Sequence, residues 1–207
     1  MKSVFLMLSA LIFLTGCQQN KSTSNKPSDL TLNSDSSRQS SENDSAALVS
    51  LLKNVFKWHD KNQSKLSDFD IVVKDSFQTG LNFESFNKTF EAIKKTNFFS
   101  ASFLNNYRKI GEYINNKLTN AHPRYLNEIN FACQEADSWT GFQDDAPNFW
   151  NDLIINDYRS SSDSASLTWW IKMNNWTSEK NPVRFVKENG EWKVSYMEGF
   201  DMDKYYR

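Results

Sequence analysis

Residues 183–194 read Val-Arg-Phe-Val-Lys-Glu-Asn-Gly-Glu-Trp-Lys-Val. Apolar residues recur on both sides of Asn189-Gly190, which is typical of two short strands. An Asn-Gly pair is the preferred centre of a type I′ turn, because both central residues of that turn need a positive φ. The stretch therefore predicts an antiparallel hairpin with strands at Val183–Lys187 and Trp192–Met197.

Two more strands are expected upstream of this hairpin, at Leu153–Arg159 and Ala165–Met173, because both segments are rich in β-branched and aromatic residues. Three helices are predicted before them, with N-caps at Asp44 or Ser45, at Asn82 and at Ser100. Their inward faces are expected to carry Leu48, Leu52, Val55, Phe56 and His59; Phe83, Phe86, Phe90 and Ile93; and Phe103, Tyr107, Ile110, Ile114 and Leu118.

A short strand is predicted at Phe69–Val73, and a fourth helix is predicted after Pro123. Helices that come first and an antiparallel meander that comes last indicate the α+β class, with the helices packed on one face of the sheet. The expected domain covers residues 44–207.

This layout, which ends in apolar-x-apolar, Asn-Gly and x-Trp-x-apolar, resembles the cystatin-like, nuclear transport factor 2-like superfamily over roughly residues 45–197. Residues 141–147, Gly-Phe-Gln-Asp-Asp-Ala-Pro, are similar to a stretch in a domain family of unknown function from small bacterial lipoproteins. Ser64–Gly80 departs from the superfamily pattern. The resemblance implies a curved, cone-like sheet whose mouth holds any ligand or active site.

The N-terminus carries an export signal. After Lys2, the apolar run Val4–Leu14 has eleven residues, about half of the ~20 that a membrane-spanning helix needs. Leu14-Thr15-Gly16-Cys17 resembles a bacterial lipobox, which implies that residues 1–16 are removed and that Cys17 receives the lipid. Gln18 at the next position, where Asp is absent, favours the outer membrane, facing the periplasm, if the host is Gram-negative.

Residues 17–43 are predicted to be a disordered tether behind the lipidated cysteine. Gln18–Asn43 contains eight Ser, no aromatic residue and only two Leu, too little apolar area to offset the entropy of ordering. As a coil it would reach about 25–30 Å.

Composition excludes several classes of function. A net charge of −1 argues against a nucleic-acid partner, which calls for a basic face. Cys133 is the only cysteine besides Cys17, so no internal disulfide is expected. Two His and one remaining thiol are a poor ligand supply for a metal, and no cofactor motif is found.

No catalytic residue is assigned from the sequence. The candidates for a general base are His59, His122, Glu135, Asp137, Asp144 and Asp145. Both histidines are expected to be partly exposed, His59 beside Asp60 at a helix end and His122 in a turn. An enzyme of the isomerase or hydrolase kind would need a buried carboxylate or His that faces another polar group.

The acidic residues between Glu135 and Asp145 could instead belong to a ligand-binding loop. Its candidate residues are Trp139, Gln143, Asp144 and Asp145, together with Trp170 on the neighbouring predicted strand. The competing interpretation is a solvated connection with Trp139 and Phe142 against the core. Trp169 and Trp170 must point to opposite faces of a strand, and Trp169 and Trp192 are expected in the core.

The expected function is therefore a non-enzymatic lipoprotein, anchored to the membrane through Cys17, that binds a small ligand, a peptide or a protein partner. Two alternatives stay open: an immunity lipoprotein that neutralises a periplasm-acting toxin, and an enzyme that uses the cone pocket.

Overall fold

The computed structural model describes residues 34–120, 124–125, 136–143, 147–173 and 176–205. The elements in chain order are α1 (Ser34–Asn62), β1 (Ile71–Lys74), β2 (Phe77–Leu81), α2 (Phe83–Lys95), α3 (Ala101–Asn120), β3 (Arg124–Tyr125), η1 (Phe149–Asn151), β4 (Ile154–Ser160), β5 (Ser164–Trp170), β6 (Lys172–Met173), β7 (Trp176–Thr177), β8 (Asn181–Glu188), β9 (Glu191–Met197), η2 (Glu198–Phe200) and α4 (Met202–Tyr205). The α+β class is confirmed.

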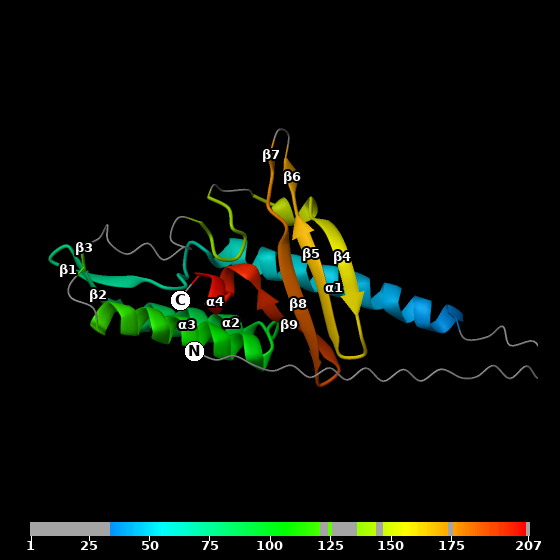
Figure 1. Ribbon diagram of the computed structural model, residues 1–207, viewed down its shortest axis with the longest axis horizontal. Helices are drawn as coiled ribbons and strands as arrows, with labels where there is room; N and C mark the ends of the chain where they lie inside the picture. Colours follow the sequence, from blue (N-terminus) through cyan, green and yellow to red (C-terminus); the bar gives the residue numbers. More distant parts are fainter. Residues whose placement is uncertain (1–33, 121–123, 126–135, 144–146, 174–175, 206–207) are drawn as a thin grey trace, which may run out of the picture.

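The main sheet is the four-stranded antiparallel meander β4-β5-β8-β9, at the right of Figure 1. Its last hairpin turns where the sequence predicted, with φ of 54° at Asn189 and 81° at Gly190. Leu167 pairs with Val183, and Val183 pairs with Met197, so buried side chains line up across three strands.

The predicted strand Ala165–Met173 is interrupted. β5 ends at Trp170, and β6 continues into a separate two-stranded ribbon with β7, which extends beyond the main sheet at the top of Figure 1. Ser178 closes the base of this ribbon, because its Oγ accepts from the Ile171 N–H at 2.9 Å and its own N–H donates to the Ile171 carbonyl at 3.0 Å.

Both predicted caps of the middle helices are confirmed. Asn82 Oδ1 accepts from the Ser85 N–H at 3.2 Å, and Ser100 Oγ accepts from the Phe103 N–H at 3.1 Å. The predicted inward residues of α3 are all buried: Phe103, Tyr107, Ile110, Ile114 and Leu118. The prediction for Phe83 was wrong. As the first residue of α2 its side chain is 46% exposed, and it meets the buried Phe86 only edge-on.

α1 begins at Ser34, before the predicted cap at Asp44. The Asp44 carboxylate instead bonds to the last hairpin, where it accepts from Trp192 Nε1 at 3.0 Å and pairs with Lys187 at 3.4 Å. Trp192 is accordingly only half-buried, with its indole N–H held at the surface, and its prediction as a core residue was wrong. Trp169 is 1% exposed, as predicted.

The segment that departed from the family pattern forms a hairpin, β1–β2, of which only the first strand was predicted. Its turn places Asp75 and Ser76 at φ of 49° and 67°, a backbone region that non-glycine residues seldom occupy. β3 pairs with β2 where a fourth helix was expected to begin, and residues 126–135, which follow β3, lie outside the described residues.

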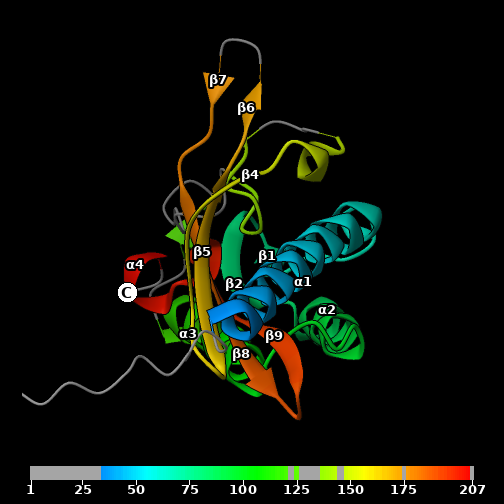
Figure 2. The same ribbon diagram turned by 90° about the vertical axis from the view of Figure 1, so that its right-hand side faces the viewer.

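Buried residues of the helices, the 139–150 region and the sheet form one hydrophobic cluster. α1 joins it through Phe56, whose ring lies 4.8 Å from Trp169 of β5. Figure 2 shows α1 beside the main sheet, with α3 farther from the viewer. Within the described residues, no helix combines the length and apolar character needed to cross a membrane.

Candidate functional site

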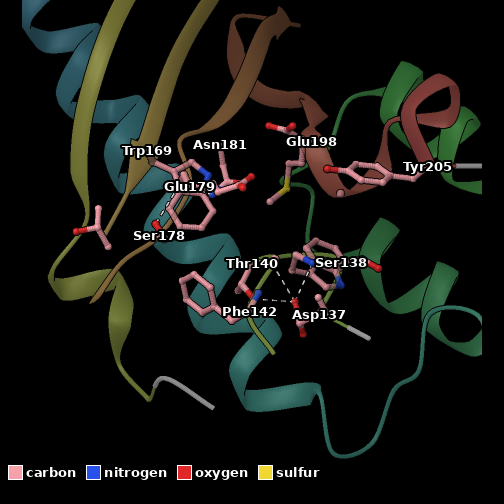
Figure 3. Close-up of a pocket in the computed structure, with 16 residues that line it drawn as sticks. Asp137, Ser138, Thr140, Phe142, Trp169, Ser178, Glu179, Asn181, Glu198 and Tyr205 are labelled. Atoms are coloured by element: carbon pink, nitrogen blue, oxygen red, sulfur yellow. Dashed lines mark hydrogen bonds between the residues drawn. The ribbon is translucent and has the colours of Figure 1, made fainter. Parts of the chain in front are cut away.

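A pocket of about 310 Å³ lies where three separate segments meet. They are the loop 136–142, the segment 177–181 that leads into β8, and the segment 197–199 with Tyr205. Asp137, Thr140 and Phe142 lie on one side of this space, and Glu179, Asn181 and Glu198 lie on the other (Figure 3).

The loop 136–142 owes its shape to Asp137. Asp137 Oδ1 accepts from the N–H groups of Trp139 and Thr140, at 2.8 and 3.0 Å, and from the Thr140 hydroxyl at 3.2 Å. The Asp137 carbonyl accepts from the Gly141 N–H at 2.7 Å, and Gly141 takes a φ of 72°. The side chain of Asp137 therefore folds the loop back on itself, as aspartates do in tight turns.

The other oxygen of Asp137 binds a helix that lies far away in the sequence. His59 Nε2, near the end of α1, is 2.6 Å from Asp137 Oδ2, and these side chains are 12% and 29% exposed. The His59 ring also stacks on Trp139, with centroids 5.1 Å apart. His59 is partly exposed, as expected, and its hydrogen-bond partner is Asp137.

Burial by itself would raise the pKa of Asp137. The hydrogen bond and charge of His59, together with the N–H groups of Trp139 and Thr140, outweigh burial and hold the pKa of Asp137 below its ordinary value. Asp137 therefore stays ionised in its contact with His59.

A second carboxylate, Asp68, lies behind the loop. It accepts from the Tyr107 hydroxyl at 2.8 Å and from Trp139 Nε1 at 2.8 Å. Burial raises the pKa of Asp68 in spite of these two hydrogen bonds. Through Asp68 the loop is joined to α3, and through Asp137 it is joined to α1.

The wall that faces the loop is polar. Ser178 Oγ and Asn181 Nδ2 both donate to the Glu179 carbonyl, at 3.0 Å each. Glu179 is exposed, and its carboxylate forms no ion pair with any residue that the structure describes. Its charge is therefore available at the pocket.

The C-terminal wall depends on a close backbone contact. A Cβ on Gly199 would lie 1.8 Å from the Ser138 carbonyl oxygen, so only glycine lets η2 approach the loop. Glu198 forms an ion pair with Lys204, and this hydrogen bond raises the pKa of Lys204. The Lys204 ammonium also lies 4.8 Å from the ring centroid of Tyr205.

The lining of the pocket is acidic and partly aromatic. Among the described residues that line it are the three carboxylates Asp137, Glu179 and Glu198, and no lysine or arginine. Its apolar surfaces come from Trp139, Phe142, Trp169, Met197 and Tyr205. Such a lining attracts cations and repels anions, even though Glu198 and Asp137 each have a positive or hydrogen-bonding neighbour.

Of the predicted ligand-binding residues, Trp139, Gln143 and Trp170 are described, and of these three only Trp139 lines the pocket. Trp139 lines the pocket but is 3% exposed, in agreement with the interpretation that tucked it and Phe142 against the core. Gln143 is exposed just beyond the lining, and Trp170 is half-buried on the face of β5 opposite Trp169. Asp144 and Asp145 lie outside the described residues, as do Cys17, His122, Cys133 and Glu135.

The sequence did not identify Asp68, Glu179 and Glu198 as candidates for this region. No sequence signal relates them: Asp68 and its partner Trp139 are 71 positions apart, and Glu179 and Glu198 belong to different segments of the pocket lining. In the described part of the chain, no group of three or more His, Cys, Asp and Glu side chains could hold a metal ion.

No model of a known protein family, no characterised protein and no solved structure matches this chain.

Proposed function

We propose that this protein is a lipid-anchored protein of the cell envelope that binds a small cationic ligand, such as an amine, in the pocket beside the loop 136–142. The observation that carries the proposal is the lining of a space of about 310 Å³, in which the described residues include three carboxylates and no lysine or arginine. That volume is at the lower end of the range for small-molecule sites. The anchor is proposed from the lipobox-like Leu14–Cys17.

The proposal includes a cone-like arrangement in which the helices and the sheet enclose the core and the pocket occupies the mouth. Its support is the shared hydrophobic cluster of α1, α3 and the sheet. The position of Met197 and Trp169 at the inner edge of the pocket also supports it, because both are nearly fully buried.

Binding accounts for the polar groups better than catalysis does. The sequence set a condition for an enzyme, a buried carboxylate or His that faces another polar group, and the half-buried pair His59 and Asp137 comes nearest to it. Both oxygens of Asp137, however, bond within the protein, and so do both oxygens of Asp68. His59 does not line the pocket. Asp137, Asp68 and His59 therefore stabilise the pocket wall, and none of the three is free to act as a general base on a ligand.

Three compounds of equal length test the proposal: 1,5-diaminopentane, 1,5-pentanediol and glutarate, each titrated into the protein by calorimetry. The diamine is expected to bind at least tenfold more tightly than the neutral diol, and glutarate is expected not to bind. Equal affinity for diamine and diol, or preference for glutarate, would contradict a cation site.

Variants locate the site. Glu179→Gln should weaken diamine binding about two- to fivefold, the effect of one solvent-exposed ion pair. Glu198→Gln should weaken diamine binding more than Glu179→Gln does. It removes one carboxylate and also leaves the Lys204 ammonium beside the pocket without its partner. Glu84→Gln, an equal charge change on the exposed first turn of α2, is the matched control and should leave binding unchanged.

A further inference from the structure

α1 presents a row of lysines on its outer side. Lys53, Lys57 and Lys61 follow one another at intervals of four residues, and this spacing places them on one face of the helix. Lys57 and Lys61 are exposed and Lys53 is half-exposed. None of the three forms an ion pair with a residue that the structure describes.

The same helix buries its opposite face. Leu48, Leu52, Val55 and Phe56 have no exposed surface and belong to the core. The exposed, uncharged residues Ala46, Ser50 and Asn54 lie on the same outer face of α1 as the lysines. The charged residues on the outer face of α1 are thus the three lysines, and Asp60 lies at the edge of this face.

Helix stability does not account for the whole row. A lysine in the last turn, such as Lys61, interacts favourably with the C-terminal end of the helix dipole. This effect falls off within one turn, and Lys53 and Lys57 lie further from the end of α1 at Asn62.

We propose that this lysine face lies on anionic lipid headgroups of the membrane that holds the anchor, an inference that rests on the proposed lipidation of Cys17. Residues 18–33 separate Cys17 from α1 and at full extension span at most about 55 Å. α1, with 29 residues, is about 43 Å long. The helix can therefore lie along the surface while the anchor stays in the bilayer.

Charge complementarity selects the lipid. Each basic side chain close to an anionic bilayer strengthens binding by about fivefold. One lipid anchor and a basic surface are the two signals that together give stable and oriented attachment. The contact also places the lysine face of α1 toward the membrane, and the pocket is then reached from another side of the domain.

The test uses the lipidated full-length protein, reconstituted into vesicles of phosphatidylcholine alone or of phosphatidylcholine with phosphatidylglycerol. Lysine acetylation is followed by mass spectrometry. In the anionic vesicles, Lys53, Lys57 and Lys61 are expected to react several-fold more slowly than in the neutral vesicles, and high salt should remove the difference. Lys109, Lys172 and Lys180, exposed on other elements, are internal controls and should react equally in both.

Paired variants exclude a general change of structure. Lys57→Gln with Lys61→Gln should abolish the protection of Lys53, whereas Lys109→Gln with Lys172→Gln should not. Equal reaction rates in both vesicle types would overturn the docking proposal. Protection that is the same in neutral vesicles and in detergent would overturn it as well, because it would indicate a protein contact. Failure of the protein to float with either vesicle would refute the anchor instead.

Discussion

Asp137 combines two structural roles in one side chain. One oxygen shapes the loop 136–142, and the other receives His59 from α1. Asp68, next to it, differs because its partners are the neutral donors Tyr107 and Trp139. The two carboxylates consequently have pKa values that move in opposite directions, downward for Asp137 and upward for Asp68.

The lowered pKa of Asp137 and the raised pKa of Asp68 should both affect how the stability of the fold depends on pH. Because the pKa of Asp137 in the folded protein is lowered from its ordinary value of 3.8, the ionised carboxylate stabilises the fold at pH values above 3.8. This stabilisation is lost as the pH falls below that value and through the lowered pKa. We expect Asp137→Asn to lower the free energy of unfolding by about 1.5–3 kcal/mol near neutral pH, and the difference from the wild type to shrink below about pH 4. Urea denaturation across this range measures it.

Asp68 contributes to the pH dependence of both proteins. Its raised pKa makes the fold relatively more stable as the pH falls through that pKa. Because the Asp137 charge contributes to this rise, the difference between the two curves reports the Asp137 charge together with its smaller effect on Asp68. Asp152→Asn is the control, because its exposed carboxylate bonds to no described residue, and its curve should match the wild type. A difference for Asp137→Asn that stays constant with pH would show that its charge has no role.

At the scale of elements, the pocket depends on how closely η2 approaches the loop. The loop is held on its other side by α1 and α3, through His59 and through the contact of Asp68 with Tyr107. The loop therefore cannot move away freely when η2 is pushed outward, and the Ser138 carbonyl is the point of contact.

Gly199→Ala tests this contact. The added Cβ would meet the Ser138 carbonyl oxygen at 1.8 Å, so the backbone of η2 or of the loop must shift, at a cost of about 1–3 kcal/mol. Diamine binding should be lost together with this stability. Gly190→Ala is the comparison, because nothing lies within 4 Å of its added Cβ and only a φ of 81° opposes it. That variant should keep diamine binding, and loss of binding in both variants would remove the link to the pocket.

At the scale of the whole molecule, the anchor and the domain are closer in sequence than the composition suggested. The prediction placed the start of the domain at Asp44, whereas α1 starts at Ser34. The Ser-rich stretch before Asp44 has no apolar period that would have revealed a helix.

Lipid attachment at Cys17 can be tested independently of the fold. Cys17→Ser should abolish incorporation of labelled palmitate and leave the export signal uncleaved, because the acyl chain is expected on that sulfur. Cys133→Ser is the matched control and should be labelled like the wild type. Label that remains in the Cys17→Ser protein would disprove the lipobox interpretation.

The sequence by itself determined the features that depend on near neighbours. The turn at Asn189-Gly190, the caps at Asn82 and Ser100 and the buried face of α3 were all predicted, because each depends on residues a few positions apart. The order of the four main strands followed from their short connections in the same way. The α+β class came from the succession of these elements.

Only the tertiary structure decided the site. Asp137 was a candidate in the sequence, but its partner His59 lies 78 residues away, and no periodicity or propensity relates such residues. The same holds for Asp68 with Trp139 and for Gly199 with Ser138. The sequence also could not show that Trp192 would turn its indole N–H to Asp44 at the surface, since burial depends on which elements meet in three dimensions. A pocket formed by three distant segments is a property of packing, and packing is set by contacts that the local sequence does not contain.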